Sequence, residues 1–548
     1  MPEKRVIEVE QESSDATLNI CLDTLAKGKQ ALVFCNTKRG AESQAERTSH
    51  AVESTDPQLL ALSEQILNVL SPPTKQCKRL ALCVKKGVAF HHAGLHAKQR
   101  ELIENSFREG IVKIICSTPT LAMGLDLPAF RVVIRDLKRF SEGGAWGMVD
   151  IPVLEYHQMA GRAGRPGMES YGEAIILAET DDQKEQRRER YILGEPEEIY
   201  SKLAVEPVLR TYVLSLIAAE FVTSRNGLHE FFERTFYAKQ YGDTRKLRSI
   251  LDAMVETLEE WEFLTVGGGQ SAGHGEPGAA RGTPRGASLF VSAKELLKQK
   301  DGELQATPLG WRVAELDLDP YTGHFLITCL QRATSRQPHD FALLQMLTSC
   351  LELRPLLRPR VRELDEIVEK TNPFLSVLLV NEPIQYSDEY EEFLMTLKTA
   401  LFLKDWVEEI QEDELLERYG VGPGEVHAKL ERADWLLYAA EELARLLSLH
   451  QLRAPLAKMR LRLKHGAKEE LLPLLQLKNI GRVRARKLVN ARIRTLGDVK
   501  EANLSTLAAL LGRQIALDVK KQVGQDLSAE RVQVKPHRRK GQTAMDDY

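Results

Sequence analysis

Two arginines placed three residues apart are the residues of this sequence whose chemistry is easiest to name. They lie in the run Gln158-Met-Ala-Gly-Arg162-Ala-Gly-Arg165, whose glycines let the backbone pass close to a ligand. Guanidiniums suit phosphate oxygens, and an arginine finger raises the rate of NTP hydrolysis by roughly 10³–10⁵. The run therefore predicts a part in NTP-driven chemistry.

Such a finger acts on a nucleotide that is held elsewhere, usually by a glycine-rich loop ending in Gly-Lys-Ser/Thr. No G-x-x-x-x-G-K-[ST] pattern occurs in the 548 residues. The nearest Gly-Lys pair, Gly28-Lys29, is followed by Gln30 and leads into a strand rather than a helix. The sequence is therefore interpreted as half of an NTP-driven machine.

Length and composition predict a folded protein of three to five domains, with 43% hydrophobic and 28% charged residues. We find neither an apolar run of about 18 residues nor a signal peptide, so a cytoplasmic protein without a membrane partner is expected. The seven cysteines are scattered without metal-ligand spacing. They predict buried, reduced thiols and no metal site.

Charge is distributed unevenly along the chain. Residues 451–548 contain 22 Lys and Arg against 9 Asp and Glu, whereas the rest of the chain is acidic. A basic end on an acidic body suits a polyanion such as nucleic acid, although a basic tail is often only a solvated surface.

The first 198 residues alternate short apolar runs with helical stretches. Strands are expected at residues 31–35, 113–116, 131–134 and 174–177, and Asn36-Thr37 is a good helix start after the first strand. Buried strands that alternate with helices predict a parallel α/β sheet, whose ligands bind beyond the carboxyl ends of the strands.

Three ordered motifs make this part specific. Phe90-His-His-Ala-Gly-Leu95, the run from Ser117 to Pro128, and the run from Gln158 to Arg165 resemble the later motifs of superfamily-2 helicases. The segments 132–140 and 151–156 narrow the resemblance to the archaeal DNA-repair helicases called Hjm, relatives of the polymerase theta helicase. The resemblance extends over essentially the whole chain but starts at the second RecA-like domain. The first such domain, with its phosphate loop and DExH box, is not in the sequence.

The resemblance implies a role for each matching residue in this domain. Arg165 would be the finger on the γ-phosphate and Arg162 its partner, while Gln158 would orient the nucleotide. Gly124 and Asp126 would lie near the ribose, although the family usually has Asn where this chain has Asp126. The cofactor would be ATP with Mg²⁺, bound mostly by the absent first domain. An isolated Gly-Arg pair would more often be a simple turn, but three motifs in helicase order favour the helicase interpretation here.

Two further features imply contact with nucleic acid. Thr118 would hold a phosphate through its hydroxyl and neighbouring amides. Residues 135–150 predict a β-hairpin around Gly143-Gly144, which in the family separates the first base pairs of a duplex. Phe140 and Trp146 are its candidate stacking residues. The alternative is that these aromatics only cover the hairpin's own face.

The remaining chain is predicted to be mostly helical. The resemblance divides it into a winged-helix domain at 199–312 with a flexible insertion at 267–287, a helical ratchet domain at 313–466, a helix–hairpin–helix domain at 467–525 and a disordered tail at 526–548. Together with residues 1–198 as the second RecA-like domain, the expected fold is an α/β RecA-like domain followed by mostly α-helical domains.

A long helix is predicted from Pro423 towards Leu449, with a buried stripe and Trp435 off its centre. In the family this ratchet helix crosses a central channel, and its tryptophan stacks on a translocating base. A core tryptophan is the alternative. Some members carry an arginine where this chain has Ala428, so Lys429 is the candidate for the second contact.

The run from Leu477 to Leu488 predicts a helix–hairpin–helix. Gly481 permits the tight turn, and the following helix begins with amides that suit a phosphate. Four cations surround this turn and predict a salt-sensitive grip on a nucleic-acid backbone, namely Arg482, Arg484, Arg486 and Lys487. The last residues resemble part of a sliding-clamp peptide through Gln542, Met545 and Tyr548, although a plain tail is an equal alternative.

The predicted function is the C-terminal part of an ATP-dependent 3′–5′ DNA helicase that acts on single-stranded, forked and recombination-intermediate DNA. A first RecA-like domain, on another chain if the gene is split, would be needed for ATP hydrolysis, and the isolated chain is expected to be inactive. Two alternatives remain, a non-catalytic DNA clamp or regulatory subunit and an RNA helicase of the exosome-assisting class.

Overall fold

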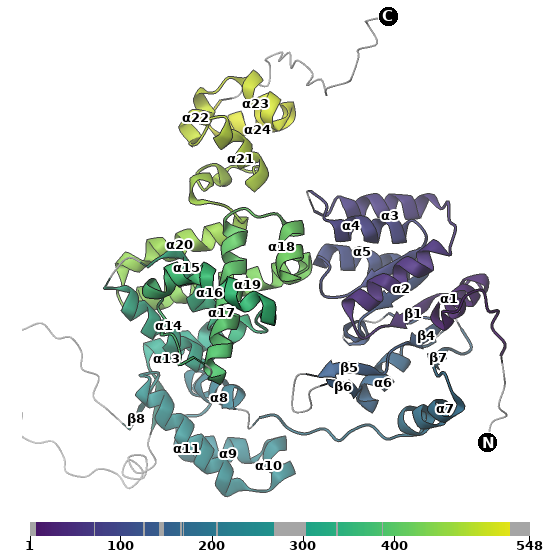
Figure 1. The fold of residues 1–548 in the computed structure, drawn as a ribbon. Coiled ribbons are helices and arrows are strands. Elements are labelled where there is room, and N and C mark those ends of the chain that lie inside the picture. Colours follow the sequence, from purple (N-terminus) through teal and green to yellow (C-terminus); the bar gives the residue numbers. More distant parts are fainter. Residues whose placement is uncertain are drawn as a thin grey trace, which may run out of the picture. The chain divides into compact units, whose positions relative to one another are not determined.

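The computed structural model describes residues 7–70, 72–123, 127–141, 147–164, 167, 169–203, 206–267, 303–335, 338–385 and 387–525. The chain forms two compact units (Figure 1). The α/β unit comprises Met1–Ile199 together with Glu412–Ala428. The helical unit comprises Tyr200–Gln411 and Lys429–Tyr548. A segment distant in sequence thus belongs to the α/β unit.

A five-stranded parallel sheet forms the centre of the α/β unit, in the order β2-β3-β1-β4-β7. The strands are β1 (Ala31–Phe34), β2 (Val88–His91), β3 (Ile114–Ser117), β4 (Arg131–Ile134) and β7 (Glu173–Ile176). Apolar strands separated by helices form such sheets because both faces can then be covered. The prediction of a parallel α/β fold is confirmed, and the predicted strands match β1, β3, β4 and β7 to within a residue or two at each end.

Helices cover this sheet, and their starts follow the capping rules. Thr37, Asp56 and Thr74 accept hydrogen bonds from the first backbone amides of α2, α3 and α4. The helical elements of the unit are α1 (Ala16–Ala26), α2 (Lys38–His50), α3 (Pro57–Leu67), α4 (Lys75–Val84), α5 (Ala97–Arg108), η1 (Pro119–Ala122), α6 (Val153–Ala160), α7 (Asp181–Arg187), η2 (Arg188–Ile192) and α18 (Glu412–Tyr419). The predicted hairpin is present as the antiparallel strands β5 (Lys138–Ser141) and β6 (Gly147–Asp150).

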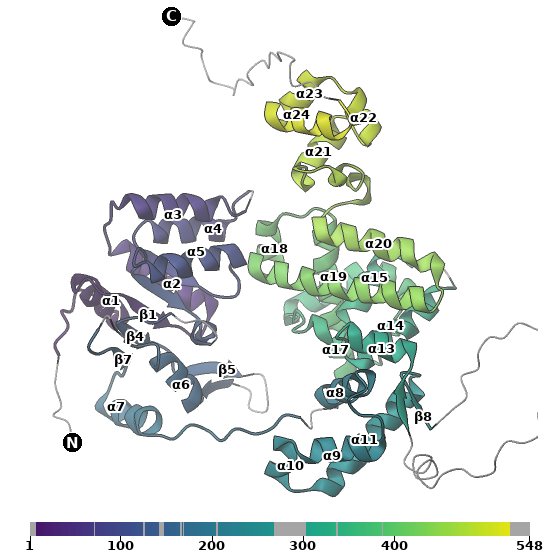
Figure 2. The same cartoon turned by 180° about the vertical axis from the view of Figure 1, so that it is seen from behind.

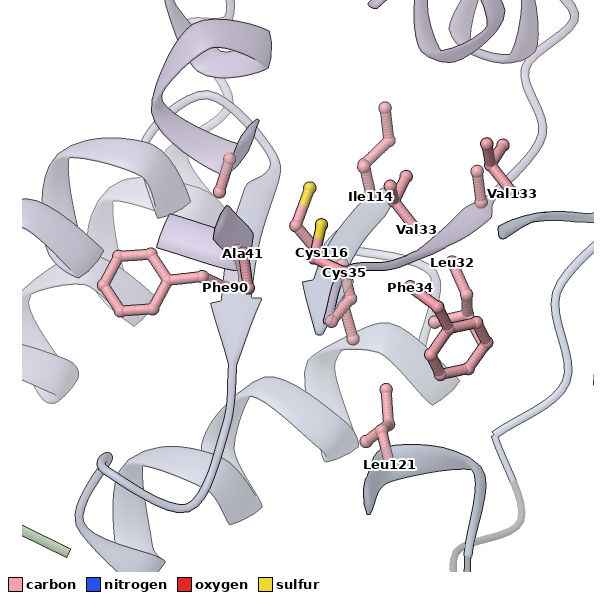
Figure 3. Packing of buried hydrophobic residues seen from close by; sticks show 14 of the residues in the cluster. Leu32, Val33, Phe34, Cys35, Ala41, Phe90, Ile114, Cys116, Leu121 and Val133 are labelled. Carbon is pink, nitrogen blue, oxygen red and sulfur yellow. The ribbon is translucent and has the colours of Figure 1, made fainter. Parts of the chain in front are cut away.

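The core of the α/β unit is built from the strands and the helix faces that pack on them. Figure 3 shows side chains of β1, β3 and β4 packed together, with the sulfur atoms of Cys35 and Cys116 among them. All seven cysteines are buried and free, as the sequence predicts. Burial raises the pKa of the Cys35 thiol to about 12, so this thiol is unreactive at neutral pH.

The most deeply buried Arg, Lys, Asp or Glu among the described residues of this unit is an arginine. Arg131 on β4 is only 2% exposed. Its guanidinium donates to Glu173 Oε2 at 2.7 Å and to Asp23 Oδ2 at 2.8 Å, and also to Thr24 Oγ1 and the Ile20 carbonyl. A buried guanidinium is tolerated only with such partners, so Arg131 links β4 to α1 and β7.

The helical unit begins with a small module of helices and two short strands, named here the winged-helix-like module; the winged-helix domain itself stays a prediction. Its helices are α8 (Glu206–Ala218), α9 (Arg225–Glu233), α10 (Phe236–Tyr241), α11 (Thr244–Glu260) and α13 (Pro308–Glu315). Strands β8 (Leu264–Val266) and β9 (Leu304–Ala306) pair antiparallel and form the wing. Apart from Gly267, the predicted insertion at 267–287 lies outside the described residues.

The rest of the helical unit is a bundle followed by a cluster of short helices, shown from behind in Figure 2. The bundle contains α14 (Pro320–Ala333), α15 (Asp340–Thr348), η3 (Leu351–Leu353), η4 (Val361–Glu363), α16 (Leu364–Thr371), η5 (Asn372–Val377), α17 (Asp388–Val407), most of α19 (Pro423–Leu446) and α20 (His450–His465). The short helices have their own apolar core and comprise η6 (Glu469–Leu471), η7 (Leu474–Gln476), α21 (Arg482–Asn490), α22 (Leu496–Glu501), α23 (Leu504–Leu511) and α24 (Arg513–Gln522). Of the helices that the structure describes, none is long and apolar enough to cross a bilayer.

Candidate nucleotide and nucleic-acid sites

The first predicted arginine links two loops of the α/β unit. Arg162 follows α6, and its Nε and Nη2 donate to the Ala122 carbonyl at 3.2 and 2.6 Å. Its own carbonyl accepts from Ala129 N at 2.9 Å, and Gly164 N donates to the Ala129 carbonyl at 2.7 Å. The glycine-arginine loop is thus fixed beside η1 and its flanking residues, which follow β3 at the carboxyl end of the sheet.

Two other predicted residues lie in the same part of the unit. Thr118 directly follows β3, and its hydroxyl is 2.9 Å from the Thr120 hydroxyl. Gln158 is exposed on the last turn of α6, which packs on η1. The structure therefore brings Thr118, Gln158 and Arg162 to one region. Arg165, Gly124 and Asp126 lie outside the described residues, and their roles stay predictions.

Gly164 and Gly172 have a structural role that was not predicted from the sequence. Gly164 has φ of +93°, and a Cβ added at Gly172 would collide with the backbone of Ala163 and Gly164. The glycines of this loop therefore let it fold against the chain just before β7. The close backbone approach seen in the structure is within the protein itself.

The hairpin is tied to the same helix that carries Gln158. Arg139 of β5 donates to Glu155 of α6 at 2.7 Å. Trp146 and the side chain of Phe140 lie outside what the structure describes, so their stacking role stays a prediction. The backbone of the hairpin strands β5 and β6 lies within the described residues.

A polar pocket of about 520 Å³ beside this hairpin was not anticipated from the sequence. Asn36 and Asp136, which follow β1 and β4, line it together with Lys138, Arg187 and Arg190. Arg190 is paired with Asp150 at 2.6 Å. Polar residues two positions after the ends of two adjacent parallel strands were the signal that could have revealed it. Its cations can hold a phosphate group.

The loop within Phe90-His-His-Ala-Gly-Leu95 is held by a buried polar network. His92 Nδ1 accepts from Gly94 N at 3.1 Å, and His92 Nε2 lies 3.1 Å from Glu42 Oε1. Glu42 also accepts from Gln76 at 2.7 Å and from Arg79 at 2.7 Å. These contacts fix the loop from inside the unit.

Glu42 is expected to make the stability of the α/β unit pH-dependent. Burial alone would raise the pKa of Glu42, but hydrogen bonds from His92 and Gln76 and the charge of Arg79 lower it to about 2. Because the folded pKa lies below the ordinary value, the stabilisation is complete above about pH 4.5 and is lost as the pH falls towards 2. At pH 7 we expect Glu42→Gln to lower the unfolding free energy by about 1–3 kcal/mol. Denaturant titrations at neutral and acid pH measure this; a deficit that stays constant down to pH 3 contradicts it.

The start of α19 packs against the same loop. Gly424 N donates to the Gly94 carbonyl at 3.0 Å, and Lys38 pairs with Glu425. His427 lies against His96 with ring centroids 5.6 Å apart. On α18, Asp413 accepts a hydrogen bond from the Lys75 backbone amide at 2.8 Å, and Glu417 forms an ion pair with the Lys75 ammonium. The predicted range 313–466 gave no sign that its residues 412–428 pack in this way.

Replacing Gly424 is expected to detach this segment. A Cβ on Gly424 would collide with the carbonyl oxygens of Ala93 and Leu95, which are backbone atoms and cannot rotate away. We expect Gly424→Ala to lower the stability of the α/β unit by about 1–3 kcal/mol and to expose residues 412–428 to hydrogen exchange. In α22, by contrast, a Cβ on Gly497 meets only Thr495 Oγ1 at 3.5 Å, so Gly497→Ala is a matched control. Equal protection of 412–428 in both variants would contradict the expectation.

In the helical unit, a hydrogen bond from the indole nitrogen holds the ring of Trp435 in place. Its Nε1 donates to the Leu316 carbonyl at 3.0 Å, and the side chain is half-buried. Lys429 is 8% exposed and donates to the Pro355 carbonyl at 2.5 Å. A nucleic-acid contact by Lys429 stays a prediction, and it requires the ammonium to leave this carbonyl.

The four cations of the predicted helix–hairpin–helix divide into two pairs. Gly481 is the N-cap residue directly before α21, and no side chain caps the helix at this end. Arg482 stacks over Trp406 at 4.4 Å, and Arg486 binds Glu409 at 2.6 and 2.8 Å and Glu470 at 2.6 Å. These two residues fasten α21 to the end of α17.

Arg484 and Lys487 form the second, exposed pair. Arg484 donates through Nη1 to the Asn479 carbonyl at 2.9 Å, and Lys487 lies exposed on the same helix. Because phosphate contacts need accessible cations, this pair is better placed for a backbone contact than Arg482 and Arg486. Gln542, Met545 and Tyr548 lie outside the described residues.

Comparison with known proteins agrees with this arrangement. Residues 14–167 match the family described as helicase conserved C-terminal domain, and residues 341–466 match archaeal helicase, domain 4. The chain is 35% identical to the ATP-dependent DNA helicase Hel308 of Methanococcus vannielii over 91% of its length and 66% of the relative's. The same name and identity apply to relatives from Methanocella arvoryzae, with 95% and 66% covered, and Pyrococcus horikoshii, with 92% and 65% covered.

The chain thus spans just under two thirds of these relatives. The resemblance drawn from the ordered motifs is confirmed by these matches. The chain belongs to the family of the archaeal Hel308 DNA helicases.

Proposed function

We propose that this chain performs the C-terminal share of an ATP-dependent 3′–5′ helicase that unwinds forked and recombination-intermediate DNA. The observation that carries the proposal is the fixed contact of Arg162 with the Ala122 carbonyl. It joins the Q-x-x-G-R-x-G-R loop to the loop that bears Thr118, at the carboxyl end of a parallel sheet, where such folds bind ligands. The relatives are named ATP-dependent DNA helicases, which supports the same activity here.

In this proposal, a first RecA-like domain binds most of the ATP and Mg²⁺, and the present chain contributes Arg162, Arg165 and Gln158. Gly124 and Asp126 lie near the ribose. Closure of the two domains on ATP then moves the α/β unit. Without a first domain, the chain hydrolyses no ATP. The first domain comes from another chain if the gene is split.

The domain division proposed from the sequence gives each part a task. Residues 1–198 act on the nucleotide, 199–312 form the winged helix, 313–466 carry the ratchet helix and 467–525 grip DNA through the helix–hairpin–helix. Because α19 begins in the α/β unit and continues in the helical unit, a movement of the α/β unit reaches the helix that bears Trp435. A sliding clamp, if bound, would meet the last residues.

DNA binding by the chain alone tests the proposal without a first domain. Fluorescence anisotropy with single-stranded DNA, forked DNA and matched RNA should show tighter binding to DNA, with affinity falling as salt rises. Trp435→Ala should weaken single-strand binding by about fivefold or more, since base stacking on an aromatic ring contributes about 1–3 kcal/mol. Preference for the RNA would favour an RNA helicase instead. Binding that Trp435→Ala leaves unchanged would refute the ratchet contact.

A further inference from the structure

A pocket of the helical unit is lined by residues for which no role was predicted from the sequence. Its volume is about 650 Å³. Thr265 and Gln305 of the wing, Trp311 of α13, and Arg445 and Leu446 at the end of α19 line it. The pocket therefore lies where the winged-helix-like module meets the long helix.

Contacts show that α13 runs antiparallel along α19. The carbonyl of Leu316, at the end of α13, accepts from Trp435 at 3.0 Å. One turn earlier, Arg312 Nη2 meets Tyr438 Oη at 3.3 Å and Glu442 at 2.5 Å. The start of α13 then meets the end of α19 at the pocket.

The pocket lies on the same side of α19 as Trp435. Leu446 follows Trp435 by eleven residues, which is about three helical turns, so both point in nearly the same direction. At 1.5 Å per residue the two are roughly 16 Å apart along the helix, or about five nucleotides at the rise of one strand of B-form DNA. The spacing between Trp435 and the pocket therefore matches a strand of about five nucleotides.

The side chains of the pocket suit a nucleobase. Trp311 is 50% exposed, an unusual position for a large apolar ring in a folded protein. At the rim, Arg445 is half exposed and uses Nη2 to bind Glu442 at 2.9 Å. Its guanidinium has further N–H donors. Glu442 and Glu315 also pair with Arg312, whose Nε is buried and has no hydrogen-bond partner among the described residues.

We propose that this pocket is a second stacking site for single-stranded DNA, in which a base stacks on Trp311 and its flanking phosphate meets Arg445. Aromatic rings bind bases of any sequence through their faces, and an adjacent arginine adds charge for the backbone. The proposal rests on the proposed function, because it extends the path of the strand beyond Trp435. It assigns Trp311 a role that its place in the winged-helix-like module did not suggest.

Binding measurements with the full chain test this site. Trp311→Ala should weaken binding of a long oligothymidylate by about fivefold or more, whereas Trp311→Phe should keep most of the affinity. Phe236→Ala is the matched control, because Phe236 is an exposed aromatic of the same module that does not line the pocket. A strand too short to span both tryptophans should lose the dependence on Trp311 but keep that on Trp435.

Photocrosslinking gives a second, direct measurement. An oligonucleotide carrying 5-iododeoxyuridine should crosslink to the peptide that contains Trp311, and Arg445→Ala should reduce the yield. If Trp435→Ala weakens binding while Trp311→Ala behaves like Phe236→Ala and no crosslink forms on α13, the second site is refuted and the proposed function stands. If the chain binds no single-stranded DNA at all, both fail.

Discussion

A helicase assembled from this chain and a first RecA-like domain is expected to lose roughly 10³-fold or more of its DNA-stimulated ATP turnover when Arg165 is replaced by alanine. In the proposed function, the Arg165 guanidinium neutralises charge that develops on the transferring phosphate. Arg165→Lys should not restore turnover, because an ammonium cannot reproduce the planar, bidentate contact. Steady-state phosphate release with saturating DNA measures the effect.

Arg162→Ala provides the comparison for this experiment. Its guanidinium holds the Ala122 carbonyl, so its loss should lower both turnover and the melting temperature of the α/β unit. Binding of single-stranded DNA should be unchanged in Arg165→Ala, which separates a loss of chemistry from a loss of grip. Turnover of Arg165→Ala within tenfold of the parent would contradict the assignment of the finger.

The second large effect concerns stability. Removing the Arg131 side chain leaves Asp23 and Glu173 without the guanidinium that they share, so Arg131→Ala should lower the unfolding free energy by about 3–5 kcal/mol. Arg131→Met retains most of the volume but not the charge. We expect a similar loss for Arg131→Met, which would show that unpaired carboxylates rather than a cavity dominate.

Denaturant unfolding of the full chain, monitored by far-UV circular dichroism, measures both variants. Lys27→Ala is the control, because Lys27 pairs with the same Asp23 at 2.5 Å but is exposed, and such pairs contribute at most about 1 kcal/mol. A loss of less than about 1 kcal/mol for Arg131→Ala would mean that water replaces the guanidinium at this position.

Local patterns in the sequence predicted the elements that depend on local physics. The apolar runs at β1 and β3, the cap at Thr37 and the hairpin strands β5 and β6 all follow from neighbouring residues. The strand that contains Phe90 was not predicted, because its residues were interpreted as a motif rather than as part of the sheet. A motif can thus begin inside a buried strand.

Long-range partners could not be predicted in the same way. Arg482 and Arg486 have the charge and position of phosphate-binding residues, yet Trp406 and Glu409, over 70 residues away, bind them in the structure. Charge density indicates that a cation is present but not which partner it meets. The same holds for Gly424. Only glycine fits at this position because the carbonyl oxygens of Ala93 and Leu95, more than 300 residues earlier, occupy the space that a Cβ would need.

These contacts connect the proposed nucleotide site with α19, the proposed DNA-binding helix. The loop after β2 is held from within by His92 and receives the start of α19 at Gly424. The same helix carries Trp435 eleven residues later. Gly424→Ala in the assembled helicase should therefore impair unwinding more than ATP turnover.

In the proposed function, this chain supplies one half of an ATP site and the grip on DNA. The most direct measurement mixes the chain with a first RecA-like domain chain and follows ATP turnover and fork unwinding with each component alone and together. We predict DNA-stimulated turnover and 3′–5′ unwinding only in the mixture, and their loss with Arg165→Ala. Robust ATP hydrolysis by the present chain alone, or a mixture that binds DNA but hydrolyses no ATP, would contradict the claim.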